Sequence, residues 1–431
     1  MSIASYLLIA LLATAPAGVF ANGSYVPPAT LLLAALALAF AAASARSPEI
    51  ATIKQTLKQF APTILVPIVW MVVQIIPAPV SWFANPIWSS AAIALNAPSL
   101  VGHISIDPGA TLHSLIWYLA LLAVIASTIL VTQDRRRAEL ILLVLTAAAT
   151  LVALGPLLGR ADQLTARVSY DGTTNGMIAL TSLLAALANA AMLAMAIERH
   201  LNHSEAIFSI SAPRLVQILL SFCGTAVSVG AIAALGRLHL LGLTVLGFAL
   251  MASIALVRRL RLRPFSATLL AVILIAATGA GLARSSASMN LLKIAESSDD
   301  STEIAQRALA GVPWVGSGVG SFAEISRVYR DFGSAGPAVP PSTAVSIAIE
   351  WGRAAPLVLA ALALQIFIFN LRGAIRRGRD SFFASLAAAG VLCALCGSFV
   401  EPGLLTPVVQ IILAVMVGLG IAQCSGRTSR V

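Results

Sequence analysis

Residues 176–197 read GMIALTSLLAALANAAMLAMAI, a run of 22 residues without a single charged side chain. A helix needs about 20 mainly apolar residues to cross the hydrocarbon core of a bilayer. The abundance of Ala and Leu in this run is typical of a helix. The run therefore predicts a membrane-spanning helix.

The composition of the whole chain extends this prediction to most of its length. Of the 431 residues, 59% are hydrophobic and 10% are charged, whereas a soluble domain averages roughly 45–50% apolar and about 25% charged residues. These values exclude a soluble globular domain, a disordered chain and a disulfide scaffold. The basic residues punctuate apolar segments and do not cluster on one polar face, so we expect no nucleic-acid partner.

Twelve stretches have the length and composition of a span. We therefore predict an all-α polytopic membrane protein with about twelve transmembrane helices, which forms a single integral membrane domain over residues 1–431. The stretches are 3–21, 25–45, 60–80, 111–132, 138–158, 176–197, 214–235, 238–257, 265–283, 354–371, 382–398 and 406–424.

The charges predict which way the helices run. Eighteen of the 27 Lys and Arg residues fall in one alternating set of loops and nine in the other, whereas only six of the 17 acids fall in the first set. Cytoplasmic loops carry the excess of Lys and Arg. The first set is therefore predicted to be cytoplasmic together with both termini, and the chemistry is expected on the outer face.

The longest outer segment is the loop 284–353, between the ninth and tenth stretches, and it holds most of the outer charge. We predict a helix near 299–311, because acids at 299, 300 and 303 suit a helix start. Gly316, Gly318 and Gly320 follow. No Gly-Lys-Ser/Thr comes after them and no βαβ pattern surrounds them, so a nucleotide-binding loop is excluded. A tight turn that lets the backbone approach a neighbour is the plainer interpretation.

Two outer arginines are candidates for binding an anion. Arg237 lies in the short turn between 214–235 and 238–257, and Arg167 lies just before 176–197, beside Tyr170 and Asn175. A guanidinium offers two parallel donors to phosphate, and a helix N-terminus also favours anions. The alternatives are an interfacial anchor for Arg237 and an ordinary capping loop for Arg167.

Three outer residues are candidate acids or bases, each with a simpler alternative. Glu350 is a candidate general base near the membrane surface, or else pairs with Arg353 in the same turn. Glu401 is a second candidate, or else a solvated loop carboxylate. His239, two residues from Arg237, is a candidate acid or base, or else a solvated loop histidine.

The cysteines and histidines give no sign of a cofactor. Cys393 and Cys396 have redox spacing but lie inside an apolar stretch, where packing explains them better. The five histidines are scattered without metal-ligand spacing, and we predict no disulfide framework, no metal site and no cofactor.

Several motifs together resemble the O-antigen ligase/polymerase superfamily of bacterial envelope glycosyltransferases. Arg167–Leu183 is similar to the family's Arg-x-x-Gly-Thr-x-x-x-Asn segment, and Leu235–Arg237 to its Ser-Arg pair between two helices. Arg307–Phe322 resembles the loop motif of Arg, Pro and Gly-x-Gly-x-Phe, and Glu350–Gly352 resembles the Glu-x-Gly after it. Ile104–Pro108 is similar to members that polymerise exopolysaccharides.

The resemblance implies a location in the bacterial inner membrane, with the loop 284–353 in the periplasm. The donor would be an oligosaccharide on undecaprenyl diphosphate, and the acceptor would be lipid A–core in a ligase or another lipid-linked repeat unit in a polymerase. Helices between 111 and 283 would hold the polyprenyl chain. The residues expected to bind the diphosphate are Arg167, Arg237 and Arg307, and those expected to make other substrate contacts are Tyr170, Asn175, Arg327 and Tyr329.

One departure from the family concerns its general base. Relatives usually carry a His eight to twelve residues before the Glu-x-Gly, whereas residues 339–345 here are VPPSTAV and the long loop has no His. Either Glu350, Glu401 or His239 takes that role, or the chain is a diverged member that acts without catalysis in an assembly complex. A polysaccharide transporter or flippase is the alternative from another class.

Overall fold

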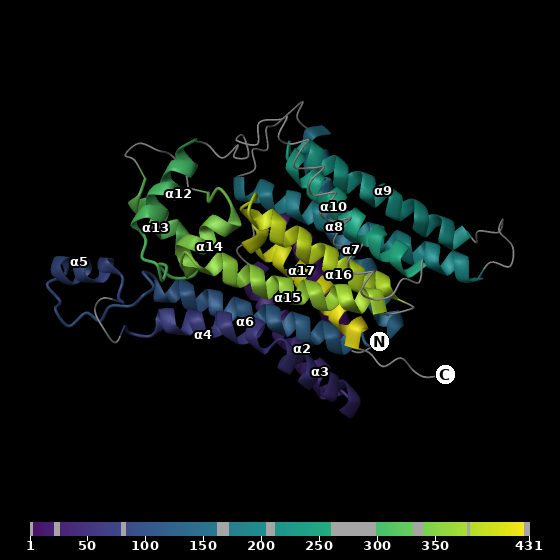
Figure 1. Cartoon of the computed structure of the whole chain (residues 1–431), viewed down its shortest axis with the longest axis horizontal. Coiled ribbons are helices and arrows are strands. Elements are labelled where there is room, and N and C mark those ends of the chain that lie inside the picture. The colour runs from purple at the N-terminus through teal and green to yellow at the C-terminus, as the bar shows by residue number, and fades with distance from the viewer. Residues whose placement is uncertain are drawn as a thin grey trace.

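The computed structural model describes residues 3–20, 26–78, 83–161, 172–203, 212–259, 299–330, 339–376 and 380–425. Within these ranges every regular element is a helix, and the only β pairing is an isolated bridge between Pro77 and His103. Long helices run side by side to form one elongated bundle (Figure 1). The predicted all-α class is confirmed.

The long helices make up the body of the bundle. They are α1 (Ile3–Phe20), α2 (Val26–Ser44), α4 (Ala61–Ile75), α6 (Pro108–Val131), α7 (Arg135–Ala161), α8 (Gly172–His203), α9 (Ala212–Ala234), α10 (Leu238–Arg259), α15 (Ala355–Arg376), α16 (Ser381–Ser398) and α17 (Pro407–Ser425). The shorter ones are α3 (Ser47–Gln59), α5 (Pro86–Ala94), α12 (Asp299–Gly311), α13 (Phe322–Val328), α14 (Thr343–Trp351) and the 3-10 helix η3 (Gly403–Leu405).

The described ranges contain nine helices that are long and apolar enough to cross a membrane, or ten if the bent pair α3 and α4 forms one span. The chain is therefore a multi-pass membrane protein by the length and composition of its helices. Eleven predicted stretches coincide with helices, and the twelfth, 265–283, lies outside the described residues. Helix α4 ends at Ile75, not at residue 80, because Pro77 holds Ile76 in an extended conformation.

The stretch 176–197 forms the centre of helix α8, which is the core of the bundle. Most of the spanning part of α8 (83%) is buried within the protein, against only 28% for α9. Helix α8 packs against α7, α9, α10, α16 and α17. Its freedom from charge therefore suits a helix surrounded by other helices as well as one surrounded by lipid.

Charged residues of the loops predicted to be cytoplasmic meet at one end of the bundle, here called the basic end. Arg135 at the start of α7 lies 3.1 Å from Asp380, just before α16. Arg258 near the end of α10 lies 2.9 Å from Glu198 near the end of α8, and also donates to Ser381. The ends of α7, α8, α10 and α16 that carry these residues therefore lie together.

The opposite end, here called the loop end, carries α5, α12, α13 and α14 (Figure 1). Helix α12 confirms the helix predicted at 299–311. A small second core holds α12–α14 together through Ala308, Val312, Phe322, Ile325 and Ile349. Part of the long loop 284–353 is thus a packed helical subregion.

Candidate functional site

A buried carboxylate at the loop end joins two predicted candidates. Glu401 follows α16, and its side chain has no exposed surface. Its Oε1 lies 2.8 Å from Nε2 of His239 and 3.4 Å from Nη1 of Arg237. Glu401, Arg237 and His239 are named the carboxylate cluster below. The alternative of a solvated Glu401 is wrong, whereas His239 is partly exposed and also pairs with this buried carboxylate.

The turn between α9 and α10 places both partners of Glu401. The N–H of Gly236 donates to the carbonyl of Ala233, and the N–H of Arg237 donates to that of Ile232. With φ of +74° at Gly236, this is a Schellman motif, in which glycine ends the helix in the left-handed region. The chain reverses at once, so Arg237 and His239 face Glu401 from the start of α10.

Two further segments close around Glu401. The backbone N–H and the hydroxyl of Thr343, at the start of α14, both donate to the Glu401 carbonyl, at 2.9 and 2.7 Å. On another side, η3 lies against the start of α8 so closely that a Cβ on Gly403 would overlap the backbone of Met177. The cluster therefore stands where α8, α10, α14 and the α16–η3 turn meet.

The cluster has polar groups that can still form hydrogen bonds with a ligand. The side chains of Arg237 and His239 are 19% and 31% exposed, so each also faces outward. Glu401 Oε2 is buried and has no hydrogen-bond partner among the described residues. It faces the first turn of α8, where a Cβ on Gly176 would lie 3.0 Å away. Asn175 precedes this glycine, so one predicted substrate contact lies beside the cluster.

An ionised carboxylate can only accept hydrogen bonds. Nε2 of His239 must therefore carry the proton in its 2.8 Å contact with Glu401. A neutral imidazole then has Nδ1 free of a proton and able to accept one. This arrangement orients His239 as a base.

Glu350 lies elsewhere and holds the Gly-rich loop together. Its Oε2 accepts from the N–H of Gly320 at 3.0 Å and its Oε1 from that of Phe322 at 3.1 Å. Burial raises the pKa of Glu350 to about 7, although these two backbone hydrogen bonds lower it. Both oxygens are occupied by the backbone, so the geometry gives Glu350 a structural role.

Arg353 does not pair with Glu350, so that alternative is wrong. Its guanidinium donates to the carbonyl of Leu309 at 2.7 Å and lies 4.7 Å from the ring centre of Trp314. The predicted close approach in the Gly-rich turn is confirmed: a Cβ on Gly316 would overlap the Glu350 carbonyl, and one on Gly318 would overlap Ser105.

The remaining predicted residues lie apart from the cluster or outside the described residues. Arg307 is exposed on α12 and pairs with Glu303, and Arg327 is exposed on α13 and pairs with Glu324. Tyr329 ends α13 and packs against Gly311. Arg167 and Tyr170 lie outside the described residues. The structure therefore joins Arg237, His239 and Glu401, but it places Arg307 and Arg327 elsewhere.

Sequence reasoning missed Thr343 and Gln74. Thr343 fastens α14 to the cluster, and Gln74 donates to the Glu350 carbonyl at 3.1 Å and accepts from the N–H of Val319. Gln74 is a fully buried amide in an apolar helix, a pattern that signals a buried hydrogen-bond network. Nothing in the sequence marked Thr343.

An apolar cavity of about 330 Å³ lies next to the cluster, among α4, α6, α14, α15, α16 and α17. Ala344, Phe399 and Leu404, each within three residues of Thr343 or Glu401, line it. Tyr118 and Leu121 continue it into the bundle. Of the described helices predicted to hold a lipid chain, α6 to α10, only α6 lines this cavity.

No disulfide joins the four cysteines, all of which lie in the described ranges. In the same ranges, no three His, Cys, Asp or Glu side chains gather in a way that would hold a metal ion. Comparison with protein-family models, with curated proteins and with solved structures finds no match for this chain.

The close approach of η3 to α8 predicts the effect of adding one methyl group. We expect Gly403→Ala to lower the free energy of unfolding by about 1–3 kcal/mol, because the new Cβ overlaps the Met177 backbone. Thermal unfolding of the detergent-purified protein measures this. Gly172→Ala is the matched control, since its Cβ meets Val339 at an ordinary 3.6 Å. Equal midpoints for both variants would contradict the packing described here.

The raised pKa of Glu350 predicts a pH-dependent stability. The folded pKa of about 7 exceeds the ordinary 4.5, so the folded state binds more protons between these values. Stability is then greatest below pH 4.5 and falls by roughly 3 kcal/mol as pH rises through 7. In Glu350→Gln this part of the pH dependence disappears. Unfolding midpoints from pH 5 to 8 test it, with the exposed Glu303→Gln as control, and an unchanged slope in Glu350→Gln would refute it.

Proposed function

We propose that the protein is a membrane glycosyltransferase of the O-antigen ligase/polymerase type. It takes an oligosaccharide from undecaprenyl diphosphate at the outer face of the membrane and transfers it to an acceptor hydroxyl. The observation that carries this proposal is the carboxylate cluster at the loop end, where a guanidinium and an imidazole share one buried carboxylate.

The reaction needs positive charge where the diphosphate leaves. As the bond between the sugar and the diphosphate breaks, negative charge develops on the leaving oxygen. Arg237 is held in place by Glu401 through one nitrogen and is partly exposed, so its remaining donors are available to phosphate. The nearby first turn of α8 adds backbone N–H groups that favour an anion.

The acceptor hydroxyl needs a base. His239, oriented by Glu401, takes the hydroxyl proton on Nδ1 while the acceptor oxygen forms the new bond to the sugar. The electron pair of the broken bond stays with undecaprenyl diphosphate, so the products are the glycosylated acceptor and free lipid diphosphate. General-base help of this kind is worth roughly 10²–10⁴-fold in rate.

The position of Thr343 supports a relocated base. The segment 339–345, where relatives carry their loop histidine, reaches the cluster through the two hydrogen bonds from Thr343 to Glu401. His239 contacts the side chain of the same glutamate. A histidine on α10 thus lies beside the segment from which the family residue is missing.

The apolar cavity beside the cluster supports a lipid-linked donor. Its lining is almost entirely hydrocarbon, which suits a polyprenyl chain and excludes a free sugar nucleotide. A lipid whose tail enters between α6, α15 and α17 would present its diphosphate near Arg237. Because Ile104–Pro108 is similar to polymerising relatives, we favour another lipid-linked repeat unit as the acceptor over lipid A–core.

We also propose a topology of twelve spans in the bacterial inner membrane, with the loop end in the periplasm and both termini in the cytoplasm. In a cysteine-free background, a membrane-impermeant maleimide should label Ile93→Cys, which is highly exposed on α5, in cells with a permeable outer membrane. Ile50→Cys on α3 should react only after the inner membrane is opened. The reverse pattern would overturn the orientation.

Arg237 and His239 give the main test of activity. With purified protein and lipid-linked oligosaccharide, we expect Arg237→Ala to lower turnover by roughly 10²–10³-fold and His239→Ala by roughly 10²–10⁴-fold. The matched controls are Arg137→Ala at the basic end and His113→Ala on an exposed face of α6, both expected to turn over like the wild type.

Each other outcome has a clear meaning. Near-normal turnover in Arg237→Ala and His239→Ala would remove the cluster from the mechanism. A wild-type protein that binds the donor but releases no lipid diphosphate would indicate a non-catalytic partner, and donor moved across vesicles without transfer would indicate a flippase. In a deletion strain, loss of polymer with single units retained would separate polymerase from ligase.

A further inference from the structure

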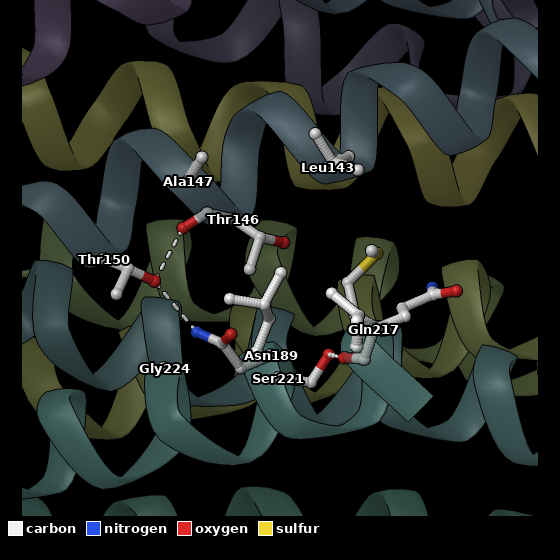
Figure 2. Close-up of a pocket in the computed structure, with 11 residues that line it drawn as sticks. Leu143, Thr146, Ala147, Thr150, Asn189, Gln217, Ser221 and Gly224 are labelled. Atoms are coloured by element: carbon white, nitrogen blue, oxygen red, sulfur yellow. Dashed lines mark hydrogen bonds between the residues drawn. The ribbon is translucent and has the colours of Figure 1, made fainter. Parts of the chain in front are cut away.

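A second cavity, of about 500 Å³, lies among α7, α8 and α9, three helices long and apolar enough to cross a membrane. Figure 2 shows the side chains that line it. Asn189 stands 17 residues from the start of α8 and nine before Glu198, so by helix geometry it lies about 25 Å from the first residue of α8 and about 13 Å from the ion pairs of the basic end. This cavity is therefore separate from the carboxylate cluster.

The cavity opens between helices towards the lipid. Leu143, Val216 and Leu220 line it and are themselves more than half exposed along the sides of their spans. None of the lining residues is charged. A ligand would thus arrive from the bilayer and carry no charge on the part that it inserts.

The polar groups in the cavity have a defined hydrogen-bond polarity. The amide nitrogen of Asn189 donates to Thr150 Oγ1 and to the Ala185 carbonyl, both at 2.9 Å. Because a carbonyl accepts only, this fixes the nitrogen on that side. Asn189 Oδ1, near Gly224, accepts no hydrogen bond from the described residues.

The hydroxyl groups in the cavity already donate hydrogen bonds to carbonyls of their own helices. Thr146 donates to the Leu142 carbonyl and Thr150 to that of Thr146, each at 2.7 Å. Ser221 donates to the Gln217 carbonyl at 2.9 Å. Figure 2 shows two of these bonds, Thr150 to Thr146 and Ser221 to Gln217. What these side chains still offer to the cavity is lone pairs.

Gln217 lines the same cavity, but it stands seven residues before Gly224, about 10 Å away along the axis of α9. Figure 2 shows its side-chain amide extending away from Asn189, so one small group does not reach both. A polar group left without a partner in hydrocarbon costs several kcal/mol, so Asn189 Oδ1 is expected to have a partner. That partner must be a hydrogen-bond donor.

We propose that this cavity binds a lipid with an uncharged hydroxyl group, such as a diacylglycerol or a polyprenol. A hydroxyl donates one hydrogen bond, which satisfies Asn189 Oδ1. A quinone or ester carbonyl cannot donate, and a phosphate brings charge to a cavity without a cation. The apolar walls, which include Ala147 and Met192, take the first carbons of the lipid chain.

The test compares lipids that differ only in the donor. The full-length protein in detergent is titrated with dioleoylglycerol, its O-methyl ether and dioleoylphosphatidic acid, and separately with a polyprenol and its methyl ether. Affinity is read from the rise in thermal midpoint with ligand concentration. We expect at least one alcohol to bind about tenfold more tightly than its ether, the ratio expected for one hydrogen bond. The pair that shows this preference identifies the lipid class.

A variant of Asn189 locates the binding. Asn189→Leu removes the acceptor and should abolish the preference for the alcohol over the ether. Asn370→Leu is the matched control, because the Asn370 amide also donates to the carbonyl four residues back but does not line the cavity. If Asn189→Leu fails to fold, the comparison of alcohol with ether on the wild-type protein still decides. Equal binding of alcohol and ether, tighter binding of phosphatidic acid, no binding of either alcohol, or equal loss of the preference in Asn189→Leu and Asn370→Leu would each overturn the proposal.

Discussion

The burial of the Glu401 carboxylate constrains the whole loop end of the bundle. Removing an ionised carboxylate from water costs several kcal/mol unless cations and hydrogen-bond donors replace the water. Arg237 and His239 supply that replacement from the start of α10, which requires α10 and the end of α16 to lie together. The close packing of Gly176 and Gly403 then brings α8 to the same point. One ion therefore determines how three spanning helices end.

Local chemistry predicted the helices well, because a spanning segment satisfies its own backbone and reveals itself by length and lack of charge. The helix 299–311 and the close approach of the Gly-rich turn could also be predicted, because each depends on residues next to one another in the sequence. The roles of the acidic residues could not be predicted in this way. Glu350 looks like a partner of Arg353 three residues away, but its real partners are amides of Gly320 and Phe322. In the same way, Phe-Val-Glu-Pro-Gly reads as a solvated turn, and only the packing of α8, α10 and α14 buries Glu401.

Hydroxyl groups in the bundle show how an apolar protein satisfies its side-chain hydrogen-bond donors. A Ser or Thr in a spanning helix bonds the carbonyl four residues back, as Thr128, Ser182 and Thr244 do. The proton is then satisfied wherever the side chain faces, and only lone pairs remain. A cavity lined by such residues consequently selects ligands that donate. The selectivity inferred for the cavity between α7 and α9 is thus a consequence of helix chemistry in hydrocarbon and requires no specially placed cation.

The two buried carboxylates, Glu350 and Glu401, stand near opposite ends of α14. They differ in whether an oxygen remains without a hydrogen-bond partner. Each oxygen of Glu350 accepts a backbone N–H, so a substrate that approached it would first have to break the Gly-rich loop. Glu401 uses one oxygen for both Arg237 and His239 and leaves the other without a partner among the described residues. Its partners Arg237 and His239 are partly exposed, so a guanidinium and an imidazole are accessible from the surface of the protein. The side chains that could bind an anion therefore lie at the Glu401 end of α14, and at the Glu350 end the two backbone hydrogen bonds fasten α14 to the Gly-rich loop.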